Sequence, residues 1–374
     1  MRFINFNNAG SSKPYQEVNQ EIRKYLVAEQ SLGGYYAAKK FEKKLDKFYI
    51  NLSKLINCNK NEISFLQSST VAWNLFLNSI NIQSNNNIVI LDNEYGSNLI
   101  FYINKEIKTK VVKINDSGEI DLNELKKKID KDTKCVCICH IASQCGNILP
   151  VEKIGRIIKK INPDIFYIVD ACQSIGQINV DVKKIKCDVL VGSGRKYLRG
   201  PRGTGFIFLN NKIRKKINPL FLDMNNAKFN SDNLRVSNRR IFENFEYSPA
   251  LKVGLSKAVE KLNAFGINKS ENIVKKKSIY LRDKLEGFQS IKFFENLNYI
   301  SGINTFQVGN IKANEVYKLL HSNKFLCSIS SFETSPLYFR KRKINSLVRI
   351  SLHEYNKFTE IDRLVKCLID LIKK

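Results

Sequence analysis

The sequence predicts an α/β protein: a large domain with a mainly parallel sheet, joined to a smaller α+β domain. Between about residue 63 and residue 209, short apolar strands alternate with segments of helical spacing, which is typical of βαβ units. From about residue 273 onward, long helical segments mix with shorter strands, which indicates a second, smaller unit. A length of 374 residues is sufficient for two such units.

Helices are predicted on either side of the alternating region. Apolar positions have helical spacing from about residue 13 to residue 56, with an interruption at Gly33 and Gly34. A second long helix is predicted over 245–265. It begins near Ser248 and Pro249, because proline is tolerated in a first helical turn.

The strands predicted for the large domain are short, β-branched and aromatic. Three of them are Ile165–Val169, Asp188–Gly192 and Gly205–Leu209. We expect the large domain to cover 15–247. The small domain is expected to combine the N-terminal segment 1–14 with the C-terminal part 248–374.

The sequence gives no sign of membrane insertion or export. It contains no uninterrupted run of about 18 apolar residues, as a membrane span requires. The N-terminus, which begins Met1-Arg2-Phe3, lacks the apolar core of a signal peptide. We therefore expect a cytoplasmic protein.

The nine cysteines indicate reduced thiols. Cys135, Cys137 and Cys139 alternate along one apolar strand, so all three point to one face and pair poorly with each other. No Cys-x-x-Cys pair is present and the three histidines are scattered. Neither disulfides nor a metal site is expected.

The formal net charge of +27 raises the question of a polyanionic partner. Lysines and arginines, however, are spread through nearly every predicted helix, and no RNP motif, zinc finger or helix-turn-helix signature accompanies them. A basic nucleic-acid-binding protein on an enzyme scaffold is kept as an alternative. We expect the charge mainly to favour anionic substrates kinetically.

An acid and a lysine follow two successive predicted strands. Asp170 ends the strand before it, and Lys196 lies just past the end of the next strand. Ligands of α/β sheets bind outside the carboxyl ends of the strands. The two side chains are therefore expected at one site.

This pair suits pyridoxal 5'-phosphate (PLP). The aldehyde of PLP needs a lysine amine for a Schiff base, which Lys196 can supply. The carboxylate of Asp170 would keep the pyridine nitrogen protonated by charge pairing. Gln173, three residues further on, could hydrogen-bond the ring hydroxyl.

Three further positions fit the same site. Ser69 and Thr70 begin a predicted helix, where hydroxyl groups and free N–H groups can either cap the helix or hold a phosphate. Tyr95 lies in a strand-to-helix loop, where an aromatic ring can lie on the cofactor. Arg349 interrupts an alternating apolar strand, as either a salt-bridge partner or a clamp for a substrate carboxylate.

Together these residues resemble the class V aminotransferase superfamily of PLP enzymes, which has the fold type I architecture. The resemblance covers nearly the whole chain. It implies the following roles: Lys196 as the Schiff-base lysine; Asp170 and Gln173 at the ring; Ser69, Thr70, Ser193 and Arg195 at the phosphate; Tyr95 over the ring; Arg349 and Asn8 at the substrate. Arg195 replaces the histidine usual in the family, and it can hold phosphate but cannot shuttle protons.

Several loops narrow the resemblance to one branch of the superfamily. The stretches Asn8-Ala9-Gly10, Gly33-Gly34-Tyr35, Arg199–Gly205 and Phe242–Glu246 resemble the isopenicillin N epimerase-like proteins and the C–S lyases of the ergothioneine pathway. Cysteine desulfurases of this superfamily carry a catalytic cysteine on a small-domain loop, and the corresponding stretch Ser328–Thr334 has none. The family's phosphate-binding threonine from the partner subunit has no clear counterpart near Glu246.

We therefore expect a PLP-dependent enzyme acting on an amino acid or an amino-acid sulfur conjugate, with C–S lyase-like elimination favoured. An aminotransferase or an amino-acid epimerase is the alternative, and a cysteine desulfurase ranks below both. The family resemblance also implies a homodimer.

Overall fold

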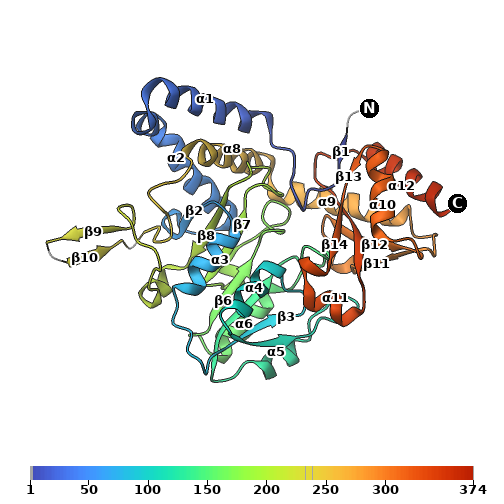
Figure 1. The fold of residues 1–374 in the computed structure, drawn as a ribbon, viewed down its shortest axis with the longest axis horizontal. Coiled ribbons are helices and arrows are strands. Elements are labelled where there is room, and N and C mark those ends of the chain that lie inside the picture. Colours follow the sequence, from blue (N-terminus) through green and yellow to red (C-terminus); the bar gives the residue numbers. More distant parts are fainter. Residues whose placement is uncertain (1–2, 232, 238, 374) are drawn as a thin grey trace.

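The computed structural model describes residues 3–231, 233–237 and 239–373. Its core is a seven-stranded sheet in the order β2-β8-β7-β6-β5-β3-β4 (Figure 1). The strands are β2 (Ile63–Leu66), β3 (Asn87–Leu91), β4 (Lys108–Val112), β5 (Thr133–Cys139), β6 (Phe166–Asp170), β7 (Val189–Ser193) and β8 (Gly205–Leu209). Only β8 runs antiparallel to its neighbours, so the predicted mainly parallel sheet is confirmed.

Helices cover both faces of this sheet. In β5, Cys135 and Cys137 pack into the core on one face, while Val136 and Ile138 pack into the core on the other. The helices that connect the strands are α3 (Ser69–Asn78), α4 (Gly96–Asn104), α5 (Leu122–Lys128), α6 (Val151–Ile161) and α7 (Val182–Ile185). Burial on both faces explains why central strands such as β6 and β7 are nearly continuous apolar runs, whereas the edge strand β4 carries two lysines and is partly exposed.

Three more helices pack together along one side of the sheet: α1 (Gln16–Leu32), α2 (Gly34–Ile56) and α8 (Pro249–Phe265) (Figure 1). The predicted break lies at Gly33, whose φ of 75° is easily adopted only by glycine. The helix predicted over 245–265 begins later, at Pro249. Ser248 caps it by accepting a hydrogen bond from the N–H of Leu251.

The C-terminal part forms a separate antiparallel sheet in the order β11-β12-β15-β14. Its strands are β11 (Ile291–Phe293), β12 (Ile303–Val308), β14 (Ser328–Ser331) and β15 (Ser346–Ser351), and its helices are α9 (Ile267–Asp283), α10 (Ala313–Ser322), α11 (Pro336–Arg342) and α12 (Phe358–Ile372). Near the N-terminus, β1 (Ile4–Asn5) pairs with β13 (Phe325–Leu326). This is the smaller α+β unit that the sequence predicts.

The packing of α8 bears on the domain boundary. Leu255, Val259 and Leu262 of this helix lie in the same apolar core as the large sheet. We therefore propose a boundary near Gly266, later than the one expected after residue 247. Ile4 and Phe6 lie in the core of the small unit, which favours the expected contribution of the N-terminal segment to that unit.

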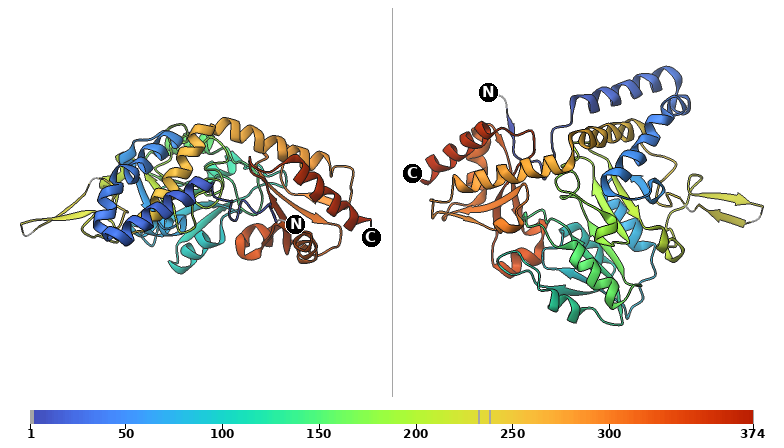
Figure 2. Two further views of the ribbon diagram at one scale, coloured as in Figure 1. Left: turned by 90° about the horizontal axis from the view of Figure 1, so that it is seen from above. Right: turned by 180° about the vertical axis from the view of Figure 1, so that it is seen from behind.

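A two-stranded hairpin of β9 (Ala227–Asn230) and β10 (Asn233–Val236) projects from the large unit, and both views of Figure 2 show it extending beyond the other elements. Short 3-10 helices lie at Lys60–Glu62, Asn211–Lys216, Leu297–Tyr299 and Phe332–Thr334. Among the described residues, no helix is long and apolar enough to span a membrane.

Candidate active site

A cavity of about 280 Å³ opens at the carboxyl ends of β5, β6 and β7. It is lined by eight residues that the sequence assigns to one site: Ser69, Thr70, Tyr95, Asp170, Gln173, Ser193, Arg195 and Lys196. Neighbouring parallel strands end at the same edge of a sheet, which is why side chains distant in sequence meet here. Arg349 and Asn8, also assigned to the site, do not line the cavity.

Asp170 and Lys196 approach the cavity from the neighbouring strands β6 and β7. Asp170 is 8% exposed, and its Oδ1 accepts a hydrogen bond from the N–H of Cys172 at 2.8 Å. Burial lowers the pKa of Lys196, against the opposing influence of Cys172 and Asp170. A lowered pKa increases the neutral fraction of the amine, which is the form that reacts with an aldehyde.

The N-terminus of α3 forms another part of the cavity wall. The side chain of Ser68 accepts a hydrogen bond from the N–H of Val71 at 3.1 Å. The N–H groups of Ser69 and Thr70, in the first turn, have no partner within the helix, and both residues line the cavity. A Cβ atom on Gly205 would lie 2.8 Å from the Cα of Ser68, so glycine allows β8 to approach this turn. Free N–H groups and hydroxyls at a helix N-terminus suit a phosphate.

Polar atoms left without partners also fit a bound cofactor. Among the described residues, the buried Gln173 Oε1, Ser143 Oγ and His140 Nδ1 have no hydrogen-bond partner. Gln173 Nε2 donates to the carbonyl of Ala9 at 3.1 Å, which fixes the amide beside the cavity. Buried polar groups are normally satisfied, so these atoms indicate a polar ligand. A free acceptor at Gln173 Oε1 and the donors at the start of α3 fit a ring that carries a hydroxyl and a phosphate group.

Tyr95 lines the cavity at the start of α4, and Glu94 lies behind it. Glu94 Oε1 accepts hydrogen bonds from the N–H of Tyr95 at 2.8 Å and from Asn98 Nδ2 at 2.9 Å. Burial raises the pKa of Glu94 to about 7, with a smaller contribution from Asp170. Ser335 Oγ donates to the carbonyl of Glu94 at 2.8 Å, which connects the small unit to Tyr95.

Arg349 is buried in β15, where no carboxylate faces it among the described residues. Its Nε donates to Ser328 Oγ at 2.9 Å, and its Nη1 donates to the carbonyl of the cavity residue Ser143 at 2.8 Å. Burial lowers the pKa of Arg349 to about 10. Of the two sequence interpretations, the clamp for a substrate carboxylate fits better than the salt bridge.

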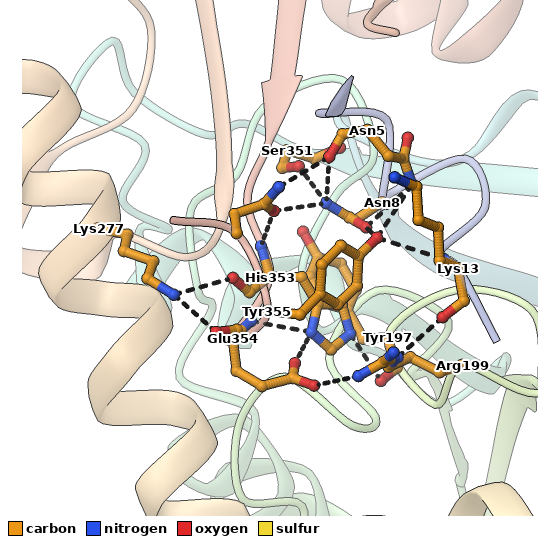
Figure 3. Close-up of polar contacts among 11 residues, drawn as sticks. Asn5, Asn8, Lys13, Tyr197, Arg199, Lys277, Ser351, His353, Glu354 and Tyr355 are labelled. Atoms are coloured by element: carbon orange, nitrogen blue, oxygen red, sulfur yellow. Dashed lines mark hydrogen bonds and ion pairs between the residues drawn. The ribbon is translucent and has the colours of Figure 1, made fainter. Parts of the chain in front are cut away.

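Asn8 does not reach the cavity. Its Nδ2 donates to the carbonyl of Ser351 at 2.6 Å and to Asn356 Oδ1 at 3.2 Å, and its Oδ1 accepts from Tyr355 (Figure 3). Both ends of the amide are therefore bonded inside the protein. A substrate role for Asn8 has no support here. The neighbouring Asn7 contacts another residue assigned to the substrate, because its Oδ1 accepts from Arg349 Nη2 at 3.4 Å.

Arg195 faces the N-terminal segment. Its Nη1 donates to the carbonyl of Gly10, and its own carbonyl accepts from the N–H of Ser12 at 2.9 Å. It also lines the cavity. The loop that follows β7 is thus bonded to a segment about 185 positions away.

Sequence reasoning missed several residues of the cavity wall. They are Gln67, Ser68, Asn98, Cys139, Ile141, Ser143, Cys172, Arg202, Gly203 and Thr204. The rule that ligands bind at strand ends could have found Ser143, which follows β5 closely. In the sequence, only the position of Glu94 beside Tyr95 indicates that Glu94 lies near the site. No group of three or more His, Cys, Asp or Glu in the described part of the chain could hold a metal ion.

The pKa of Glu94 predicts a pH dependence of stability. An unfolded glutamate ionises near pH 4.3, whereas folded Glu94 keeps its proton up to about pH 7. The free energy of unfolding should therefore fall by about 3 kcal/mol as the pH rises between these values. In Glu94→Gln this contribution should be absent. Urea unfolding at pH 4.5 and pH 7.5 measures it, with the exposed Glu286→Gln as the control. Equal pH dependence in both variants would contradict the assignment.

The fold and the cavity together define a PLP-dependent enzyme. The sequence model of the aminotransferase class-V family matches residues 4–364, and the chain belongs to this family. A probable cysteine desulfurase of Methanothermobacter thermautotrophicus is 25% identical over 370 residues, which cover 96% of this chain and 91% of that protein. A cysteine desulfurase of Wigglesworthia glossinidia brevipalpis is 29% identical over 393 residues, which cover 98% and 92%.

Solved structures have the same fold. The apo cysteine desulfurase from Thermococcus onnurineus NA1 superposes with a TM-score of 0.92 at 22% identity, over 99% of this chain and 95% of that one. A C-DES mutant with glycine covalently linked to its PLP cofactor gives a TM-score of 0.87 at 16% identity, over 98% and 96%. The predicted fold type I architecture and the PLP cofactor are confirmed.

The predicted branch of the superfamily was wrong. The relatives are named cysteine desulfurases, and not epimerase-like proteins or ergothioneine-pathway lyases. Two glycines in the motifs behind that prediction, Gly33 and Gly203, have φ angles of 75° and 81°. Such glycines meet a requirement of the backbone and carry little information on the reaction.

Proposed function

We propose that the protein cleaves the C–S bond of L-cysteine or a cysteine conjugate by elimination and releases the sulfur directly to solvent. Its family and its PLP dependence support chemistry at the α-carbon of an amino acid. The bound cofactor supplies an electron-withdrawing ring at that carbon. The sulfur could either be released or be transferred to a thiol of the protein. The observation that favours release is that the thiols around the cavity are protonated.

None of the thiols near the site has the lowered pKa that would make it a nucleophile for sulfur. The loop Ser328–Thr334 has no cysteine, and the preceding Cys327 is buried in the small-unit core with its pKa raised by burial to about 12. Of the two thiols that line the cavity, burial raises the pKa of Cys172 to about 12 and that of Cys139 well above its usual range. The thiolate is the nucleophilic form, so a protein persulfide is disfavoured.

The residues have the following roles in this proposal. The lowered pKa of Lys196 supports its action as the base that takes the α-proton. Asp170 holds the positive charge of the ring nitrogen, and Arg349 binds the substrate carboxylate. The electrons of the broken C–H bond form the Cα–Cβ double bond, while the C–S electrons leave with the sulfur. Water then converts the enamine product to pyruvate and ammonium.

Cysteine desulfurase activity is the second candidate, because the relatives carry that name. It begins with the same substrate but yields alanine and protein-bound sulfur. Transamination and epimerisation would share the proton abstraction and leave the C–S bond intact.

Product analysis separates these reactions. Holoenzyme incubated with L-cysteine is expected to give sulfide, pyruvate and ammonium in equal amounts, and Cys327→Ser should react at the same rate. Alanine without pyruvate, or loss of activity in Cys327→Ser, would overturn the proposal in favour of a desulfurase. Keto acid without sulfide would indicate an aminotransferase, and D-cysteine an epimerase.

We also propose a homodimer. Phe229 and Leu234 on the projecting hairpin are 88% and 52% exposed, and Met224 beside it is 72% exposed. An isolated two-stranded hairpin is marginally stable, and clustered exposed apolar side chains mark interfaces. A second copy of the chain would cover them. Sedimentation equilibrium should give twice the mass of the chain, whereas the single-chain mass would refute the dimer.

A further inference from the structure

The side chain of Tyr197, the residue after Lys196, has an unsatisfied polar group. Tyr197 is 1% exposed. Its hydroxyl has no hydrogen-bond partner among the described residues. A buried hydroxyl without a partner is destabilising, and most are satisfied in native proteins. The hydroxyl of Tyr197 is therefore free to form a hydrogen bond with a ligand.

Arg349 lies near this hydroxyl and has donors to spare. The phenol of Tyr197 and the guanidinium of Arg349 are close enough for each to affect the pKa of the other. Arg349 uses one N–H on Ser328, one on Ser143 and one on Asn7. A guanidinium has five N–H donors, so two remain for a bound carboxylate.

His353 holds the ring of Tyr197 in place. The imidazole is fully buried between two tyrosine rings, 5.3 Å from the centroid of Tyr197 and 5.0 Å from that of Tyr355, at interplanar angles of 23° and 22° (Figure 3). Burial lowers the pKa of His353 well below its usual range, so the ring is neutral. Its Nδ1 accepts from the N–H of Glu354 at 2.9 Å and also contacts the carboxylate of Glu354. Because the carbonyl oxygen of Tyr197 can only accept a hydrogen bond, Nε2 carries a proton. Nε2 then donates to the carbonyl of Tyr197 at 3.1 Å.

A cation–π contact and an ion pair extend this arrangement. The guanidinium of Arg199 lies 4.5 Å from the ring centroid of Tyr355 and pairs with Glu354 at 2.8 Å. Lys277 of α9 donates to the carbonyl of Glu354 at 2.7 Å. The segment after Lys196 is thus bonded to the small unit on several sides, as Figure 3 shows.

The two tyrosines on either side of His353 differ in one respect. The hydroxyl of Tyr355 is engaged: it accepts from Asn5 Nδ2 at 3.1 Å and from the N–H of Lys13 at 3.2 Å, and it donates to Asn8. The hydroxyl of Tyr197 has no such partner in the part of the chain that the structure describes. Tyr355 therefore contributes to the framework, and it provides a matched control for Tyr197.

We propose that the hydroxyl of Tyr197 joins Arg349 in binding the α-carboxylate of the substrate, and that His353 is the positioning residue for its ring. This inference rests on the proposed function of the site at Lys196. An O–H donor and two N–H donors then face one carboxylate. The site would select amino acids over amines that lack a carboxylate.

The test compares L-alanine with ethylamine, which is alanine without its carboxylate. Both are titrated into PLP-loaded wild type, Tyr197→Phe and Tyr355→Phe, and the absorbance change of the cofactor gives each Kd. We expect Tyr197→Phe to raise the Kd of L-alanine about tenfold, as for a lost hydrogen bond to a charged group, and to leave that of ethylamine unchanged. Its melting temperature should not fall, because the hydroxyl has no partner to lose. Tyr355→Phe should lower the melting temperature and change neither Kd more than about twofold.

The position of His353 is tested in the same titration. His353→Phe keeps an aromatic ring but loses the donor to the Tyr197 carbonyl. It should therefore raise the Kd of L-alanine more than the Kd of ethylamine. An unchanged Kd for L-alanine in Tyr197→Phe, or an equal weakening of both ligands, would overturn the inference and leave the role of Lys196 intact. A wild-type protein that takes up no PLP would overturn the proposed function first, and this inference with it.

Discussion

Lys196→Ala is expected to reduce turnover of L-cysteine at least about 10³-fold. The variant loses both the amine that bonds the cofactor and the base that takes the α-proton, and a positioned base alone contributes about 10²- to 10⁴-fold. The visible absorbance band of the lysine-linked cofactor should disappear as well. Steady-state kinetics and an absorbance spectrum of the purified variant measure both effects.

The control for this variant is Lys160→Ala, which removes an exposed lysine of α6. It should keep the wild-type spectrum and rate, because surface lysines contribute little to either stability or chemistry. The hydroxyl and N–H groups at the start of α3 are intact in Lys196→Ala, so some cofactor should still bind without a covalent link. A Lys196→Ala protein that keeps the lysine-linked band would show that another amine holds the cofactor.

The large domain could be predicted because its signals are local. Strands β5, β6 and β7 are buried on both faces, so each is a continuous apolar run that the sequence displays directly. Parallel strands also end at a common edge, and this rule alone predicts that Asp170 and Lys196 lie at one site. The eight predicted residues that line the cavity lie at or after the ends of strands or at the starts of helices of this domain.

The contacts that the N-terminal segment makes within the small unit could not be predicted in the same way. The position of this segment depends on the pairing of Ile4 with Phe325 and on the hydrogen bonds of Asn8 with Ser351 and Asn356. These contacts join residues more than 300 positions apart, and nothing in the local sequence specifies them. Asn8 was therefore assigned to the substrate when its amide is committed to the framework.

The role of Tyr197 could not be predicted from the sequence for a related reason. A tyrosine after a lysine has no distinctive pattern. Its hydroxyl becomes informative only when the fold buries it beside Arg349 without a hydrogen-bond partner. Such residues are identified by checking, in the folded structure, which buried polar groups have hydrogen-bond partners.

Asp170→Asn is expected to lower kcat about 10²- to 10³-fold while the spectrum still shows bound cofactor. Asparagine keeps the shape of the side chain, and its Oδ1 can still accept from the N–H of Cys172 at 2.8 Å. The change thus removes the negative charge and little else. Loss of one partner of a buried ion pair costs about 3–5 kcal/mol, and a tenfold rate change corresponds to about 1.4 kcal/mol.

The rate of Asp170→Asn reports on the electron sink, because Lys196 remains to form the covalent link. Asp164→Asn is the matched control: it removes a fully exposed carboxylate that pairs with Lys216 on the surface, and it should leave kcat unchanged. A neutral residue at position 170 leaves the protonated ring nitrogen without its counter-charge, so the nitrogen should lose its proton at lower pH. The pH profile of kcat in Asp170→Asn should therefore shift to lower pH. Full turnover with an unshifted profile would show that the ring nitrogen is not held by Asp170.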